Sequence, residues 1–262
     1  MSWWSGWIGG AVGYALGGPI GALIGAVVGQ YIGKQAGGSG IHIDVDNRER
    51  SQAAFFAATF SVMGHVAKVD GIVTQEEIRF GENLMAQMRL NTAQRRAAID
   101  LYRQGKSPDF RIDDVLDQFC YVCRRHDNLL RMFMDIQLQA AYADQEFHPA
   151  QRRVLLHVSD RLGFSRAEFE RMADMVGAAH RYRRAPAQGQ AGVSLDDAYA
   201  LLEIEQGASD AEVKNAYRRM LSRHHPDKLI AKGLPEEMIR LANEKTFAIR
   251  QAYEQIKSAR RH

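Results

Sequence analysis

The chain carries the stretch DAEVKNAYRRMLSRHHPDK from Asp210 to Lys228. Its apolar residues recur every three or four positions, which is the spacing of one face of an α-helix. The members of this face are Val213, Ala216, Tyr217, Met220, Leu221 and His224. Ser209 and Glu212 have the spacing of a capping box, so the helix is predicted to begin just after Ser209.

The tripeptide His225-Pro226-Asp227 stands at the end of this helix. Pro226 cannot continue a helix and disfavours the α conformation in the residue before it, so the tripeptide is expected in a loop. Two further helices flank the stretch, a short one at about 195–204 and a long one at about 235–260. The apolar members of the long helix are Ile239, Ala242, Phe247, Ile249, Ala252, Tyr253 and Ile256.

A short helix, a basic helix, a His-Pro-Asp loop and a long helix carrying Gln251-Ala-Tyr-Glu254 resemble the J-domain family of co-chaperones. The resemblance assigns residues 194–262 to a J-domain helical hairpin. In that family the basic helix docks on a DnaK-type heat-shock chaperone, and the loop accelerates ATP hydrolysis by that partner. The docking residues that the resemblance implies are Lys214, Tyr217, Arg218, Arg219, His225, Pro226 and Asp227.

Two other interpretations of these residues are weaker. The basic face, taken alone, is what most solvated helices have. His225 and Asp227 could form an acid–base pair, but the sequence offers no nucleophile, glycine-rich phosphate loop or metal cluster beside them. We therefore expect no catalytic residue and no cofactor, and a regulator of a partner ATPase rather than an enzyme.

The N-terminal segment is uncharged from Trp3 to Gly33. A membrane-spanning helix needs roughly 20 predominantly apolar residues, so residues 1–34 are predicted to be a single transmembrane helix in a lipid bilayer. Aromatic residues at both edges suit the membrane interfaces. The alternatives are a flexible glycine-rich tail or a segment lying on the membrane surface. Residues 35–47 read as a linker.

Glycine recurs at every fourth position of this segment, a pattern that lets two membrane helices approach closely. The predicted dimerisation residues are Gly9, Gly13, Gly17, Gly21, Gly25 and Gly29, which would make a homodimer through the transmembrane helix. Lys34, Arg48 and Arg50 follow the span and weakly favour a cytoplasmic C-terminal side. A cytosolic DnaK-type partner and its cytosolic ATP favour this orientation more strongly.

Residues 48–182 show helical patterns throughout, for which we expect about seven helices and no sheet. The stretches 67–77 and 141–151 look like an internal repeat and resemble the TerB-like family of helical domains. One reading makes Asp70, Glu77, Asp144 and Glu146 a metal or ligand site. The favoured reading makes the aspartates turn and cap formers, so no metal site is predicted.

Cys120 and Cys123 lie on a helical pattern that favours reduced, buried thiols. His126 would add a third ligand, but a structural zinc site needs four. The chain has 34 Lys plus Arg against 31 Asp plus Glu, a balance that does not suggest nucleic acid as a partner. Residues 183–193 read as a second, flexible linker.

The combination of glycine-rich anchor, TerB-like domain and C-terminal J-domain resembles the DjlA group of membrane-anchored DnaJ-like co-chaperones. The resemblance implies a protein of the cell inner membrane that recruits its partner to the cytoplasmic face. The fold class expected is all-α. The alternative function is a membrane-bound stress sensor or scaffold whose TerB-like domain binds a metal or a signalling partner. The client proteins, expected to be membrane-associated, stay unknown at the level of sequence.

Overall fold

The computed structural model describes residues 47–69, 71, 73–123, 127–143, 147–184, 195–227 and 239–260. Every regular element in these ranges is helical and none is a strand, so the all-α fold is confirmed for them. None of their helices is long and apolar enough to cross a membrane. The predicted anchor 1–34, with its glycine ridge, lies outside the described residues, as do Asp70, His126, Asp144 and Glu146.

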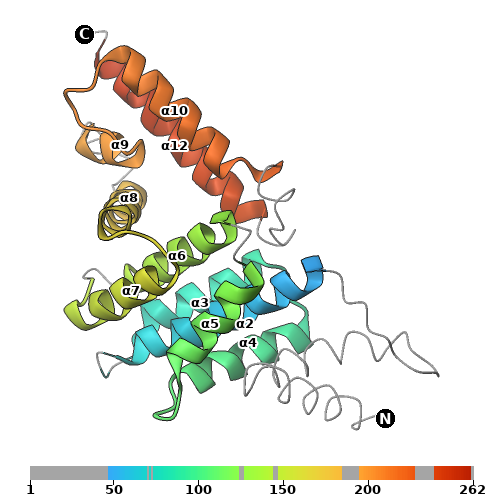
Figure 1. The fold of residues 1–262 in the computed structure, drawn as a ribbon. Coiled ribbons are helices and arrows are strands. Elements are labelled where there is room, and N and C mark those ends of the chain that lie inside the picture. The colour runs from blue at the N-terminus through green and yellow to red at the C-terminus, as the bar shows by residue number, and fades with distance from the viewer. Residues whose placement is uncertain are drawn as a thin grey trace.

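Seven helices occupy the described part of residues 47–184, in agreement with the expected number (Figure 1). They are α2 (Asn47–Lys68), α3 (Gln75–Gln87), α4 (Thr92–Gly105), α5 (Ile112–Cys123), α6 (Asp127–Ala141), α7 (Pro149–Arg161) and α8 (Arg166–Arg184). Their core is built around Phe55, Phe119 and Phe133, all fully buried. We call this unit the TerB-like domain.

Local signals in the sequence set the starts of these helices as predicted. Thr74 and Glu77 form a complete capping box at α3, and Ser165 and Glu168 exchange the same pair of hydrogen bonds before α8. Pro149 opens α7, where its missing N–H would have no helical partner. Each signal involves only residues within about one helical turn, so the sequence alone was enough to predict where these helices begin.

The two repeat segments meet in space. Gln151 Nε2 donates to Glu77 Oε1 at 2.9 Å, and both residues are buried. They hold the same position in the two repeats, 74 residues apart. The repeat therefore corresponds to a contact between the starts of α3 and α7.

Residues 195–260 contribute three further described helices, α9 (Leu195–Leu201), α10 (Asp210–His224) and α12 (Ile239–Ala259). Figure 1 shows α10 and α12 side by side as a long hairpin, with α9 across one end. The apolar face predicted for α10 is turned inward, with Val213, Ala216 and Met220 buried. We call this unit the J-domain.

One apolar residue of α12 lies on the surface of the helix. Phe247 is 63% exposed, whereas Ile249, Ala252 and Ile256 are fully buried. The buried positions recur at spacings of three and four, and Phe247 precedes Ile249 by two residues, which is about 200° around a helix. The position of Phe247 around the helix, and not its apolar side chain, therefore decides its exposure.

Candidate functional site

The His225-Pro226-Asp227 tripeptide, which we continue to call the loop, begins where α10 ends. Only His225 is extended; Pro226 and Asp227 are helical, so the prediction of a loop was wrong for these two residues, because proline is well tolerated in a first helical turn. His225 caps α10 with an extended backbone, φ −64° and ψ 125°, as the following proline predicts. The backbone N–H of Asp227 donates to His225 Nδ1 at 3.3 Å, so in the neutral ring the proton is on Nε2. The Asp227 side chain is 84% exposed. The loop thus holds its imidazole in one orientation and keeps its carboxylate accessible.

The basic side chains of α10 fall into two groups: those that have no acidic partner among the described residues, which we call free, and those that bind another part of the fold, which we call structural. Lys214, Arg218 and Arg219 are exposed, and none of them pairs with an acidic residue in the part of the chain that the structure describes. Tyr217 differs from them, because its ring stacks on Tyr253 with centroids 4.1 Å apart. The three cations are therefore available to a partner, while Tyr217 is held within the hairpin.

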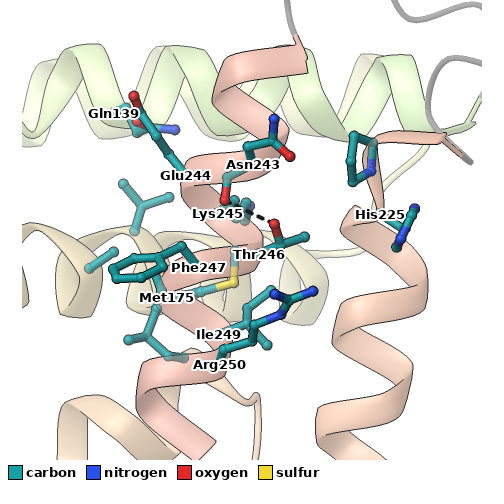
Figure 2. Close-up of a pocket in the computed structure, with 15 residues that line it drawn as sticks. Gln139, Met175, His225, Asn243, Glu244, Lys245, Thr246, Phe247, Ile249 and Arg250 are labelled. Carbon is teal, nitrogen blue, oxygen red and sulfur yellow. Dashed lines mark hydrogen bonds between the residues drawn. The ribbon is translucent and has the colours of Figure 1, made fainter.

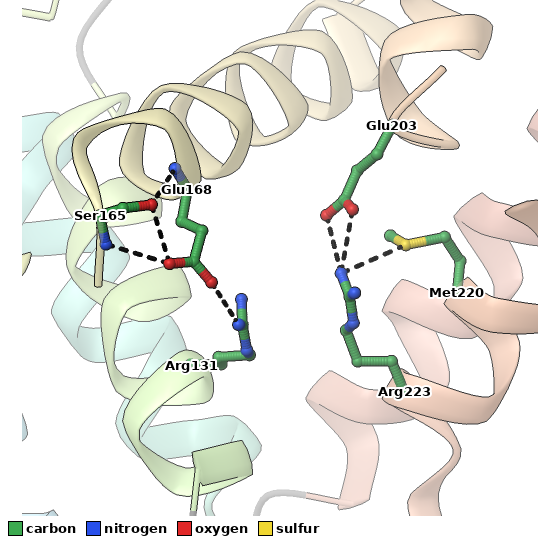
Figure 3. Close-up of polar contacts among 6 residues, drawn as sticks. All are labelled: Arg131, Ser165, Glu168, Glu203, Met220 and Arg223. Carbon is green, nitrogen blue, oxygen red and sulfur yellow. Dashed lines mark hydrogen bonds and ion pairs between the residues drawn. The ribbon is translucent and has the colours of Figure 1, made fainter. Parts of the chain in front are cut away.

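Arg223 lies on the same helix but has a structural role. Its Nη1 donates to both carboxylate oxygens of Glu203, at 3.0 and 2.9 Å (Figure 3). Glu203 follows α9 with a left-handed φ of 56°, where Ile204 N–H reaches back to Tyr199 O. This is the Schellman arrangement that usually uses glycine, so Arg223 fastens a helix end that is otherwise strained.

Arg260, just after α12, closes the opposite end of the J-domain. It donates to the Tyr199 hydroxyl at 2.8 Å, to Asp210 Oδ1 at 2.7 Å and to the backbone oxygen of Ala208 at 2.6 Å. These contacts hold α9, α10 and α12 together at the end of the hairpin far from the loop. The sequence did not suggest this role, because the three partners are distant along the chain.

A cavity of about 710 Å³ lies beside the loop, where the J-domain meets α6 and α8 (Figure 2). Met175, Phe247 and Ile249 give it apolar walls, and His225 and Pro226 also line it. Figure 2 shows Phe247 and His225 on opposite sides of α12. Because Phe247 lines this cavity together with Met175 of α8, it belongs to a surface shared by both domains.

The TerB-like domain brings few metal-ligating groups together. In the described ranges no group of three or more His, Cys, Asp or Glu side chains could hold a metal ion. Glu77 is engaged by Thr74 and Gln151. Because the other residues of the suggested acidic site lie outside those ranges, the absence of a metal site stays a prediction.

The two cysteines are free thiols, but only one fits the prediction of burial. Cys123 is fully buried, and burial raises the pKa of its thiol to about 12. Cys120 is half-buried, and its Sγ lies 3.6 Å from the backbone oxygen of Arg161. Burial raises the pKa of Cys120 as well, so neither side chain is a ready thiolate.

Sequence reasoning missed an ion pair between the domains. Lys245 Nζ of α12 donates to Asp135 Oδ2 of α6. A signal existed, because each is a charged residue on an otherwise buried stripe: Lys245 lies between Ala242 and Ile249, and Asp135 lies between Met132 and Leu138. The sequence could not reveal that the two charges meet.

Comparison with known proteins agrees with this architecture. Family models match the chain in three places: the co-chaperone DjlA transmembrane domain at residues 1–40, the tellurite resistance protein TerB at 56–174 and the DnaJ domain at 197–262. The co-chaperone protein DjlA of Escherichia coli K12 is 41% identical over 220 residues, which cover 80% of this chain and 81% of that protein. The chain belongs to the co-chaperone DjlA family.

Other members of the DjlA family are similarly close. The co-chaperone protein DjlA of Shewanella oneidensis is 40% identical over 224 residues, with 86% of this chain and 85% of that protein covered. The protein of the same name from Haemophilus influenzae is 39% identical over 232 residues, with coverage of 80% and 81%. No solved structure matches the chain.

Proposed function

We propose that this membrane co-chaperone recruits a DnaK-type chaperone and stimulates its ATP hydrolysis through His225, Pro226 and Asp227. The observation that carries the proposal is the loop itself, with an oriented imidazole and an exposed carboxylate at the end of a basic helix. The ATP chemistry would take place in the partner, so the chain acts as a regulator and not as an enzyme.

Lys214, Arg218 and Arg219 supply the charge for docking. Exposed charges of one sign speed up encounter with an oppositely charged surface more than they add to affinity. The proposed partner surface is therefore acidic. The contribution of these charges should decrease with salt, because the Debye length falls from about 10 Å at 0.1 M to about 3 Å at 1 M.

The N-terminal segment would fix where this recruitment occurs. The match of residues 1–40 to the DjlA transmembrane domain supports a membrane anchor. We infer a single pass through the inner membrane with the TerB-like domain and J-domain in the cytoplasm, where a DnaK-type partner has its ATP. We also infer that the glycine ridge from Gly9 to Gly29 pairs two copies, which would bring two J-domains together.

A pull-down from membranes tests this function. The full chain and its His225→Gln variant are compared as bait in the presence of ATP, and an Arg218→Glu variant serves as a separate test of charge. The expected result is that the wild-type chain retains the DnaK-type chaperone and both variants lose most of it. Equal recovery with all three baits would contradict the proposal.

A further inference from the structure

The two domains share parts of their apolar cores. Met175 and Ala178 of α8, a helix of the TerB-like domain, belong to the core of the J-domain. Ala242 of α12 is fully buried within the core of the TerB-like domain. Arg181 Nε of α8 also donates to Asp197 Oδ1 of α9 at 3.0 Å. The J-domain is therefore seated on the TerB-like domain, with α8 packed against α9 at the contact (Figure 1).

We call this contact between the two domains the seat. A buried ion pair joins the domains within the seat, close to the His-Pro-Asp loop. Lys245 of α12 and Asp135 of α6 are paired, with side chains 16% and 4% exposed. Water screens such a pair weakly, so the attraction is stronger than at the surface. Loss of one partner would leave the other charge poorly solvated. The pair therefore favours the arrangement in which α12 lies against α6.

His224 links this ion pair to the loop. It is the last residue of α10, lies directly before His225 and is buried. Its pKa lies well below 6.5, first because of burial and then because of the positive charges of Lys245, Arg223 and Arg131. The imidazole lines a small cavity together with Arg131 and Asp135 of α6, so a movement of α12 against α6 would change the surroundings of the residue directly before His225.

We propose that Asp135 and Lys245 are positioning residues for the His-Pro-Asp loop, because their ion pair seats the base of the α10–α12 hairpin on the TerB-like domain. The inference rests on the proposed function of the loop. A seated J-domain loses less orientational freedom when it docks, and a smaller entropic cost means tighter docking. The TerB-like domain thereby determines the direction in which the loop meets the chaperone.

The seat leaves the docking surface open. Asp227 is exposed, and Lys214 and Arg218 remain accessible while Lys245 is paired. A seat that blocked docking would have covered these side chains. Breaking the pair is therefore expected to weaken docking, not to release a blocked J-domain.

The test titrates a DnaK-type chaperone with the full chain in lipid nanodiscs and measures single-turnover ATP hydrolysis. Asp135→Asn keeps the size of the side chain and removes its charge. We expect it to raise the half-saturating concentration of the chain about tenfold, which corresponds to about 1.4 kcal/mol. The rate at saturation should not change, because only docking is impaired. Lys245→Met should behave in the same way.

Two further variants separate positioning from a general loss of structure. The exchange of both charges, Asp135→Lys with Lys245→Asp, should restore the half-saturating concentration. Asp100→Asn removes an exposed carboxylate of α4 that pairs with Arg103, and it should change nothing. A merely structural role would lower the fraction of folded chain and reduce the rate at saturation.

The possible failures are distinguishable. If Asp135→Asn and the wild-type chain have the same half-saturating concentration, or if the charge exchange gives no rescue, the positioning role is refuted while the function of the loop stands. If the wild-type chain gives no stimulation at all, the proposed function itself is refuted, and the positioning role with it.

Discussion

Replacing Arg223 by alanine should destabilise the J-domain, although Arg223 lies on the same basic helix as the proposed docking residues. Its guanidinium binds Glu203, whose side chain is only 11% exposed, and the Arg223 side chain is 28% exposed. Hydrogen bonds to charged groups contribute about 1.5–3 kcal/mol, so we expect a loss of about 2 kcal/mol. At about 2–4 °C per kcal/mol for a unit of about 200 residues, the melting temperature should fall by about 4–8 °C.

The matched control is Arg218→Ala. Arg218 is exposed and has no acidic partner in the described ranges, so its loss should change stability by no more than about 0.5 kcal/mol. Thermal unfolding of the full chain in nanodiscs, followed by circular dichroism, measures both variants. Glu203→Ala combined with Arg223→Ala should cost less than the sum of the two changes. Equal melting temperatures for Arg218→Ala and Arg223→Ala would refute the division between free and structural cations.

Three other predictions concern the seat, the TerB-like domain and the anchor. Because the pKa of His224 is lowered in the folded chain, its contribution to stability is present above about pH 6.5 and is lost as the pH falls below that value. Hydrogen exchange of the α10 amides should therefore show less protection at pH 5 than at pH 7.5. His224→Phe should remove most of this difference. A chelator should leave the melting temperature of the TerB-like domain unchanged, and a drop restored by one divalent ion would establish a metal site. Gly17→Leu and Gly21→Leu should lower self-association in a crosslinking assay more than Ala22→Leu, because a glycine ridge permits close backbone contact.

The features of the fold that the sequence predicted are those with local causes. The capping boxes at Ser209 and Thr74 require only residues within one helical turn, and the structure contains both. The His225 conformation follows from the next residue being proline. Phe247 is apolar in the sequence, but its position around α12 places it on the surface.

The relation between the domains could not be predicted, since it depends on side chains more than a hundred residues apart. Lys245 and Asp135 are separated by 110 residues, and each reads in the sequence as an isolated charge on a buried stripe. The basic residues of α10 also looked alike in the sequence. Only the position of Glu203 distinguishes Arg223, which is tied into the fold, from Arg218, which is free.

The measurement that tests the central claim most directly is single-turnover ATP hydrolysis by a DnaK-type chaperone with the full chain in nanodiscs. The wild-type chain should accelerate hydrolysis. His225→Gln should abolish the acceleration without lowering the melting temperature, because a loop residue outside the core rarely changes stability by more than about 0.5 kcal/mol. A folded His225→Gln chain that stimulates as strongly as the wild type would contradict the account.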